Sequence, residues 1–467
     1  MTASSDSHSK AHRWRTLFAL AFGYFIDQGQ GQAISVLFPT IRALWGLDYS
    51  ALGIIGTISN IVQAVSAPIW GYVADRVSRR NVIFIGTGLW GLWTIACGFT
   101  QNFGQLLVVR AISGIGLGCL MPATFSLMSD TFPSKQRGRA LGTMEAIGVL
   151  GIIVGTLGLG MLATPTLWRW GFFILGGASI LSGIVVWFSI KEPPRGATEP
   201  ELAGKITTEQ AAKYRIEIAD MARVLTIPTV WVAILQGLVG SMPWVVMGLY
   251  FISWLVDTRG MVEALVFDHP AGSATLTFAG IVLGTACSNI LGGILGDWAE
   301  QRSPKYGRAI VGQVSIVSGI PLSYIMLTQT ADWNFWPFFF LCFGTALMIS
   351  WPGKGAKEPM MQGAVPPELR ATAFAMTAFI ESGFAAIAAF IAGSLADRIG
   401  LTPAMVWTIA VPRAAIADAA RVLDEDFGRA VVAQIARQRD QLDVHPDRSS
   451  SRARSDINSR IFATSRG

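Results

Sequence analysis

Long apolar stretches recur along this chain, and they constrain its fold more than any other feature. Each is about as long as a helix that crosses the hydrocarbon core of a bilayer, which takes roughly 20 residues. Backbone N–H and C=O groups must pair with each other inside the bilayer, so such stretches form helices. Helical spans are therefore expected at residues 14–41, 51–73, 82–99, 103–128, 140–162 and 170–190, and again at 230–256, 273–295, 309–327, 335–351 and 371–395.

A polar segment separates the two sets of spans and divides the chain into halves. It begins at Lys191-Glu-Pro-Pro-Arg195, where proline removes a backbone donor and stops a helix. We expect an all-α integral membrane protein built from two six-helix bundles related by pseudo-twofold symmetry. Its expected parts are a cytoplasmic tail at 1–13, an N-terminal bundle at 14–190, a linker at 191–227 with an amphipathic helix near 207–225, a C-terminal bundle at 228–423 and a polar tail at 424–467.

The twelfth span is less regular than the others. Only residues 401–411 are apolar, and Pro412, Arg413 and Asp418 follow them. A helix extended to residue 423 could cross the bilayer only if those side chains turned toward the protein interior. The sequence therefore leaves open whether the twelfth helix is complete.

The overall composition excludes several classes of protein. With 52% hydrophobic and 14% charged residues and a mean hydropathy of +0.47, the chain is not a water-soluble globular protein. Its net charge of +6 comes from basic residues placed between spans, which suits anionic lipid headgroups better than nucleic acid. The four cysteines lie inside apolar stretches, so we expect no disulfide framework. We also expect no cleaved signal peptide, cofactor or metal site.

The distribution of basic residues predicts the orientation of the chain in its membrane. Connectors at 76–80, 135–139, 302–308 and 354–370 carry arginine or lysine, and the alternate connectors carry almost none. Positively charged loops stay in the cytoplasm. We therefore expect a multi-pass protein of the inner or plasma membrane with both termini and the linker in the cytoplasm.

One short basic connector contains a motif that the second half repeats. The motif reads G-x-x-x-D-R-x-x-R-R between the second and third spans, and G-x-x-x-D recurs after the eighth. A single copy could be a loop that only sets topology. Two copies at matching places indicate a duplicated transporter fold. The residues concerned are Gly71, Asp75, Arg76, Arg79 and Arg80 in the first copy, and Gly293 and Asp297 in the second.

The first copy resembles the signature loop of the major facilitator superfamily. This resemblance implies a gate on the cytoplasmic side, formed by the acid and the arginines of the motif, here Asp75, Arg76 and Arg80. In the second copy Trp298 stands where Arg76 stands in the first, so we expect the second gate to be weaker. Glu145, near the cytoplasmic end of the fifth span, is a further candidate gate residue.

Charged residues inside the spans are candidates for chemistry, because a charge in a bilayer is costly and usually faces a cavity or a partner. Asp27 lies midway along the first span beside Gln28. It is either a proton carrier, because burial disfavours its charged form, or a structural acid held by hydrogen bonds or an arginine. Glu381, in the eleventh span, is a second candidate for protonation.

Arg110 in the fourth span, followed four residues later by Gly114, resembles the fourth-helix motif of the same superfamily. An arginine cannot give up its proton, so it either pairs with an acid, such as Asp27 or Glu145, or holds an anionic group of a substrate. Candidate polar residues on cavity faces are Asn60, Gln63 and Gln236, each of which could equally bond to a neighbouring helix.

A finer resemblance concerns the first half of the chain. Y-F-I-D in the first span, G-I-G in the fourth, D-x-F-P-x-x-x-R after it and E-P-P-R-G at 192–196 resemble the Spinster-like branch of the superfamily. That resemblance implies lysolipids or sphingoid lipids as substrates. A small organic anion or a sugar-like solute remains open.

The main functional prediction is a monomeric secondary transporter that moves a small organic or lipid-like solute by alternating access, coupled to protons. The first alternative is an enzyme embedded in the membrane, which the lack of nucleophile and metal signatures in the spans argues against. The second alternative is a sensor or scaffold that keeps the fold but does not transport.

Overall fold

The computed structural model describes residues 2–132, 134–190, 192, 228–260, 270–303, 307–328, 334–350, 357 and 370–409. Within these ranges the chain is helical and contains no strand, which confirms the predicted all-α fold. The first half contains α1 Thr2–Gly31, α2 Ala33–Trp45, α3 Tyr49–Arg76, α4 Arg79–Ile83, the π-helix η1 Phe84–Leu89, α5 Gly91–Gly98, α6 Phe103–Leu117, α7 Leu120–Thr131, α8 Ser134–Leu162 and α9 Trp168–Ser189.

The second half contains fewer described elements. They are α12 Pro228–Asp257, α13 Pro270–Arg302, α14 Gly307–Thr328, α15 Phe335–Ile349 and α17 Arg370–Ile399. A further helical stretch covers residues 401–409, where the twelfth span was expected to begin. The rest of that span, the amphipathic helix near 207–225 and the C-terminal tail lie outside the described residues.

Three of the predicted spans in the first half are divided into two or more helices. The first span is α1 followed by α2, and the fourth is α6 followed by α7. The third begins as α4, widens into η1 and continues as α5. A π-turn inserts one extra residue into a helix and shifts the side chains that follow it. Such interruptions cannot be read from an apolar run of the right length.

Glycines bring α1 and α8 into close contact. A Cβ atom added at Gly155 would lie 2.5 Å from the Cα of Gly29, and one added at Gly29 would lie 3.1 Å from the carbonyl oxygen of Gly151. Small residues at a crossing let two helix backbones approach, which is the usual way that helices associate in membranes. The glycine-rich fifth span therefore serves helix packing.

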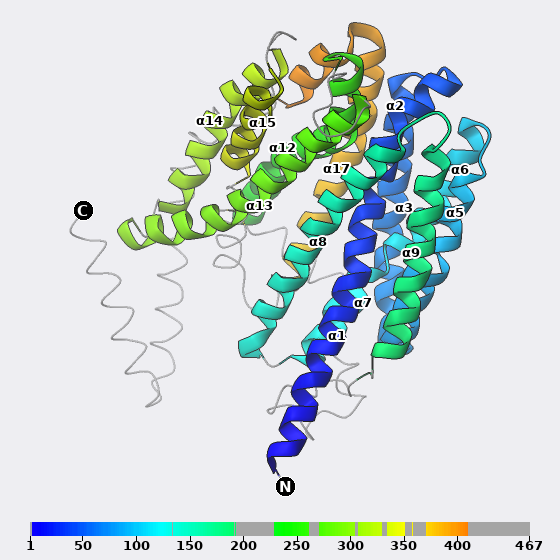
Figure 1. Ribbon diagram of the computed structural model, residues 1–467. Helices are drawn as coiled ribbons and strands as arrows, with labels where there is room; N and C mark the ends of the chain where they lie inside the picture. Colours follow the sequence, from blue (N-terminus) through cyan, green and yellow to red (C-terminus); the bar gives the residue numbers. More distant parts are fainter. Residues whose placement is uncertain are drawn as a thin grey trace.

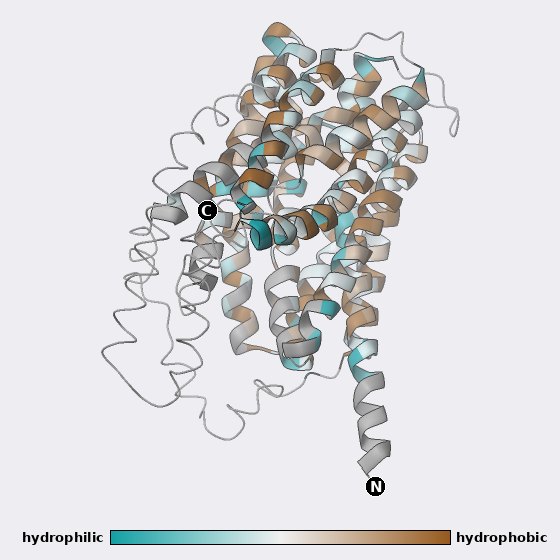
Figure 2. Ribbon diagram, turned by 90° about the vertical axis from the view of Figure 1, so that its left-hand side faces the viewer, coloured by the Kyte–Doolittle hydropathy of each residue, from teal (hydrophilic) through white to brown (hydrophobic). Residues whose placement is uncertain are grey.

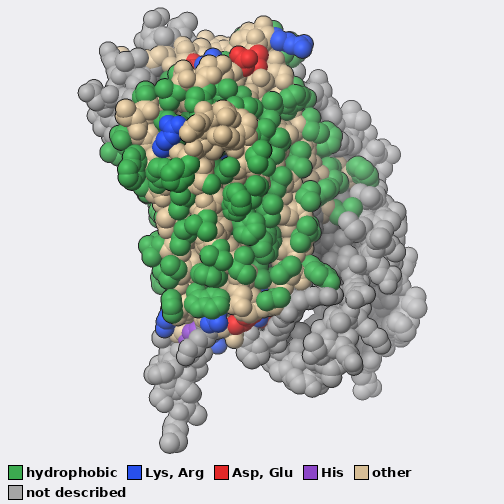
Figure 3. Space-filling view, turned by 90° about the vertical axis from the view of Figure 1, so that its right-hand side faces the viewer, with side chains coloured by type: hydrophobic (Ala, Val, Ile, Leu, Met, Phe, Trp, Pro, Cys, Tyr) green, Lys and Arg blue, Asp and Glu red, His purple; other side chains and the backbone are tan. Residues whose placement is uncertain are grey.

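The outer surface suits lipid rather than water. Within the described ranges, seven helices are long and apolar enough to cross a membrane. Large apolar side chains such as Phe188 and Ile290 are exposed on them. Figure 3 shows hydrophobic side chains over the middle of one face and most charged side chains near its two ends, and apolar colouring dominates the helices in Figure 2. This is the pattern of a bilayer-spanning protein.

The two halves meet along a few helices. In Figure 1 the helices α1–α9 lie mostly on one side and α12–α15 on the other. Between the halves, α3 packs on α17, α8 on α13, and α2 on α12. We call the end of the molecule that holds Arg42 and Tyr49 the Arg42 end, and the end that holds Arg79 and Glu192 the Arg79 end.

Candidate functional site

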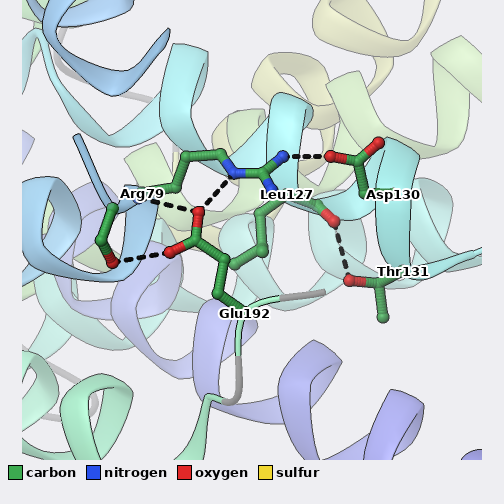
Figure 4. A network of polar contacts seen from close by, with 6 residues as sticks. Arg79, Leu127, Asp130, Thr131 and Glu192 are labelled. Carbon is green, nitrogen blue, oxygen red and sulfur yellow. Dashed lines mark hydrogen bonds and ion pairs between the residues drawn. The ribbon is translucent and has the colours of Figure 1, made fainter. Parts of the chain in front are cut away.

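A buried ion-pair network surrounds Arg79 at the start of α4 (Figure 4). The guanidinium of Arg79 is 1% exposed and pairs with Asp130 at the end of α7. Its Nε also donates to Glu192 Oε1 at 2.8 Å. The network thus joins the ends of α4, α7 and α9, which are all parts of the first half.

Glu192 also caps α4. It accepts the backbone N–H of Arg79 at 3.1 Å and the hydroxyl of Ser78 at 2.6 Å. Burial disfavours the charged form of Glu192, but the hydrogen bonds from Ser78 and Arg79 and the charge of Arg79 outweigh it, so that the pKa of Glu192 is lowered. A carboxylate at the first turn of a helix is also favoured by the helix dipole.

The other predicted gate residues of the first half lie in different surroundings. Arg80 stacks over the ring of Trp187, with its Cζ 4.5 Å from the ring centroid. Glu145 is exposed on α8 and accepts a hydrogen bond from the Tyr24 hydroxyl at 3.3 Å. The backbone of α3 carries the remaining three, Gly71, Asp75 and Arg76, whose side chains lie outside the described part of the structure.

The second copy of the motif has an acid–arginine cluster of its own. Arg308, at the start of α14, pairs with Asp297 and also with Glu300 at 2.8 Å. These hydrogen bonds and charges outweigh partial burial and raise the pKa of Arg308. Gly293 has open space where a Cβ would lie. Trp298, which stands where the first copy has Arg76, carries the guanidinium of Arg302 on its ring.

Charged groups also join the two halves at the Arg42 end. Arg42 of α2 pairs with Asp257 at the end of α12, with an N–O distance of 2.9 Å. The hydroxyl of Tyr49 donates to the same carboxylate at 3.0 Å, and Arg42 lies 4.0 Å from the centroid of the Tyr49 ring. Two residues of the first half therefore hold one acid of the second.

A second carboxylate crosses between the halves close by. Asp397 of α17 accepts the backbone N–H of Tyr49 at 2.7 Å and that of Ser50 at 3.0 Å. It satisfies two of the amide groups that the first turn of α3 leaves without partners. The Arg42 end is thus held by two acids from the second half, against a cation and a helix N-terminus from the first.

Asp27 and Arg110 lie near each other in the interior of the first half. Arg110 is 5% exposed, and among the described residues its Nη1 has no hydrogen-bond partner. Asp27 of α1 is close enough for the two charges to interact, although no direct ion pair joins them in the described structure. Arg110 is therefore a buried cation with a free donor.

The predicted polar residues of the cavity faces are scattered. Gln28 lies beside the Tyr24 hydroxyl, Gln63 donates to the carbonyl oxygen of Leu117 at 3.4 Å, and Asn60 is partly buried on α3. The side chain of Gln236 lies outside the described part. Sequence reasoning missed Gln30, which is buried and donates to Thr94.

Glu381 is not isolated. On α17 it forms an ion pair with Lys357, and the two side chains are 17% and 15% exposed. Lys357, Asp257, Asp397 and Arg42 were not singled out from the sequence. The signal for the last three was their place just beyond the ends of spans, where polar residues are common and partners cannot be assigned. Within the described residues, no three His, Cys, Asp or Glu side chains are grouped to hold a metal ion.

Comparison with known proteins gives consistent matches. The sequence profile of the Major Facilitator Superfamily matches residues 20–383. A "Probable 4-methylmuconolactone transporter" of Cupriavidus pinatubonensis is 24% identical over 396 residues, covering 84% of this chain and 86% of the relative. The "Cis,cis-muconate transport protein" of Acinetobacter baylyi is 29% identical over 184 residues, covering 39% and 44% of the two chains.

A solved structure has a similar fold. It is described as a bacterial homologue of the human lysosomal transporter Spinster, in an inward-facing and unoccupied conformation. The TM-score is 0.76 at 20% sequence identity, and the match covers 90% of this chain and 98% of the other.

Proposed function

Because this chain belongs to the Major Facilitator Superfamily, a family of multi-pass membrane transporters, we propose that it carries small organic anions by alternating access, coupled to protons. The relatives named above are transporters of small organic solutes, which agrees with the expectation that the chain is not an enzyme. Muconate is a carboxylate, and carboxylates are the anions that we propose for this chain.

The observation that carries this proposal is the state of Arg110. A guanidinium stays charged at any physiological pH, and burying it is costly unless it is paired and hydrogen-bonded. Arg110 is 95% shielded from solvent and keeps Nη1 free among the described residues. An anionic substrate group would supply the missing acceptor, and a planar guanidinium holds a carboxylate well. Arg110 therefore serves as the substrate-binding cation rather than as half of a fixed pair.

Alternating access is supported by the charged contacts that join the two halves at the Arg42 end. At the Arg42 end, Asp257 and Asp397 of the second half bind residues of the first. The described ion pairs of Arg79, with Asp130 and Glu192, lie within the first half. With the orientation expected from the basic connectors, the contacts of Asp257 and Asp397 with the first half would hold the outer side closed. The gate residues of the sequence motif, Asp75 and Arg76 among them, would close the inner side in the opposite conformation.

Proton coupling is assigned to Asp27. It is the carboxylate whose charge acts on Arg110, so its protonation would remove the negative charge that repels an anion arriving at the guanidinium. A ligand shifts a conformational equilibrium only through a difference in affinity between the two states. The proton on Asp27 and the anion on Arg110 together supply that difference. The protein would do this as a monomer in the plasma membrane with both termini in the cytoplasm.

A second candidate function is transport of lysolipids or sphingoid lipids. The motifs of the first half that resemble the Spinster-like branch, such as Y-F-I-D in the first span, favour it. A scaffold that has lost transport is the third candidate. The three differ in what crosses the membrane.

The test is uptake into vesicles that contain the purified protein. Labelled muconate, a lysophospholipid and a sugar are offered with and without an imposed pH gradient, acidic outside. We expect accumulation of the carboxylate that a protonophore abolishes. Flux of only the lysophospholipid or only the sugar would contradict the proposal and indicate a lipid or a sugar transporter, respectively. No flux of any of the three would favour the scaffold.

A pair of arginine variants makes the test specific to the site. Arg110→Ala should lower carboxylate uptake by at least about tenfold, because it removes a charge-assisted bond to the substrate. Arg302→Ala is the matched control, since that arginine is exposed on the ring of Trp298. Equal uptake by both variants would remove Arg110 from the mechanism.

A further inference from the structure

The ion pair between Lys357 and Glu381 places a charged side chain inside an apolar span, where a charge is energetically unfavourable. Glu381 is eleven residues into α17 (Arg370–Ile399), which places it about 16 Å from the start of the helix at 1.5 Å per residue. It also falls within the apolar span Phe379–Ile399. Moving two charges out of water costs several kcal/mol for each ion, and intramembrane charges mark substrate or proton pathways by default.

The third partner of this pair is a glycine. A Cβ atom added at Gly237 of α12 would collide with Oε1 of Glu381 and with Nζ of Lys357. The atoms in the way are the charged tips themselves, at the ends of long flexible side chains. The absence of a side chain at Gly237 therefore leaves room for the pair against the backbone of α12.

No other charge of the packed helices lies at this depth. α17 packs against α3 and α12, and the charged residues of these helices are near their ends: Asp75 and Arg76 of α3, Asp257 of α12, and Arg370, Asp397 and Arg398 of α17. In the sequence, Lys354 and Glu358 lie close to Lys357, outside the described residues. The other titratable residues of α3 and α12 are Tyr49, Tyr72 and Tyr250.

We propose that Lys357 and Glu381 form a second carboxylate site, in which a carboxylate of the substrate replaces that of Glu381 on Lys357 while Glu381 takes up a proton. This inference rests on the proposed transport of organic anions. The N–H donors of Lys357 pass from the Glu381 carboxylate to the substrate carboxylate, and one proton bonds to the released Glu381 oxygen. The site holds one cation and one anion before and after the exchange, so its net charge stays at zero.

The physical reason for coupling is the cost of an unpaired buried anion. If the substrate displaced Glu381 without a proton, a carboxylate would remain uncompensated in apolar surroundings, which is strongly unfavourable. Binding of the anion at Lys357 therefore requires a proton at Glu381. The two side chains are 15–17% exposed, so the protein does not enclose them completely.

The experiment compares the wild type with Glu381→Gln, Lys357→Gln and the double variant in reconstituted vesicles. In the wild type the apparent KM for a carboxylate should rise as pH rises, because Glu381 must be protonated. Glu381→Gln should keep substrate exchange, show a KM that depends less on pH than that of the wild type, and accumulate less substrate under the pH gradient, because the proton proposed at Asp27 remains. Lys357→Gln should raise KM by about tenfold or more, as expected from losing one charge-assisted bond, and Lys357→Arg should restore part of it.

Two further comparisons separate this role from a structural one. The double variant removes both charges and should fold, as judged by thermal unfolding, yet keep the raised KM of Lys357→Gln. Gly237→Ala should displace the pair and change the pH profile, whereas Gly248→Ala on the same helix has nothing within 4 Å of its added Cβ and should behave as the wild type. A double variant that transports like the wild type would show that the pair is only structural.

The outcomes also distinguish failure of this inference from failure of the proposed function. If the wild type moves carboxylates and Glu381→Gln keeps both gradient-driven accumulation and the wild-type pH profile, the inference is wrong and the proposed function stands. If the wild type moves no carboxylate, the proposed function is wrong and this site falls with it.

Discussion

Asp397 of α17 caps the N-terminus of α3, accepting the backbone N–H groups of Tyr49 at 2.7 Å and Ser50 at 3.0 Å. The residue that occupies the N-cap position of α3, Asp48, makes no capping hydrogen bond with its side chain. One half of the protein thus supplies the cap for a helix of the other half. A cap of this kind exists only while the two halves touch, so its free energy favours the conformation closed at the Arg42 end.

We expect Asp397→Ala to shift the protein toward the conformation open at that end. Losing a helix cap costs about 1 kcal/mol, or about fivefold in the ratio of the two conformations. Spin labels at the exposed positions Phe99 and Ile399, in a variant without native cysteines, should report a larger population of long distances. Asp48→Ala is the control, and a shift of the same size in that variant would contradict the role of Asp397.

The buried network around Arg79 predicts a large difference between two adjacent arginines. Arg79→Gln removes the buried cation that pairs with Asp130 and Glu192, and breaking a buried pair costs about 3 kcal/mol or more. Arg80 lies on the ring of Trp187, where a cation–π contact contributes about 0.5–1 kcal/mol. Thermal unfolding in detergent should therefore show a much larger fall in Tm for Arg79→Gln than for Arg80→Gln. Equal falls would mean that the network adds no stability.

Glu192 gives the same network a pH dependence with a definite sign. Its pKa in the folded protein lies below the ordinary glutamate range, so its contribution to stability is complete above the unfolded pKa, about 4.3. That contribution is lost as pH falls through the lowered pKa. The difference in Tm between the wild type and Glu192→Gln should be constant from neutral pH down to about 4.3 and shrink only below it. A difference that shrinks already between pH 7 and 5 would contradict this pairing.

The apolar runs predicted most of the helices because bilayer thickness sets a length that the sequence must satisfy. The run at 103–128 corresponds to α6 and α7 together, and the run at 140–162 lies within α8. Breaks inside a run, such as η1, depend on packing against neighbours. They leave the hydropathy of the run unchanged and were not predicted.

The sequence predicted which charged residues would belong to the candidate site better than it predicted their partners. Arg79 and Glu381 stood out as charges in or beside spans, but their partners did not. Arg79 pairs with residues 51 and 113 positions away in sequence, and helix packing alone brings such residues together. Asp397 resembled any polar residue at the end of a span. Its role depends on the other half of the chain, which a local pattern cannot show.

The contact between α1 and α8 predicts different outcomes for two glycines of one helix. Gly155→Ala would push its Cβ to 2.5 Å from the Cα of Gly29, and overpacking of this kind costs about 1–3 kcal/mol. Gly158 has nothing within 4 Å of an added Cβ, so Gly158→Ala should be neutral, or stabilising by up to about 1 kcal/mol through helix propensity. Thermal unfolding of the two variants checks this. A loss of stability in Gly158→Ala as large as in Gly155→Ala would show that α8 tolerates alanine nowhere along this face.

Asp27 is the residue on which coupling in the first half depends. Asp27→Asn mimics the protonated carboxyl group permanently. The charge that Arg110 experiences from position 27 therefore no longer changes with pH. We expect this variant to exchange labelled for unlabelled carboxylate at close to the wild-type rate, because exchange needs no net proton movement. Under a pH gradient it should accumulate less substrate than the wild type, because only the proton proposed at Glu381 remains to drive uptake. Asp48→Asn, at the Arg42 end, should retain both activities. Accumulation at the wild-type level by Asp27→Asn would remove Asp27 from the coupling mechanism and leave Glu381 as the described carboxyl group inside a span that we propose for that role.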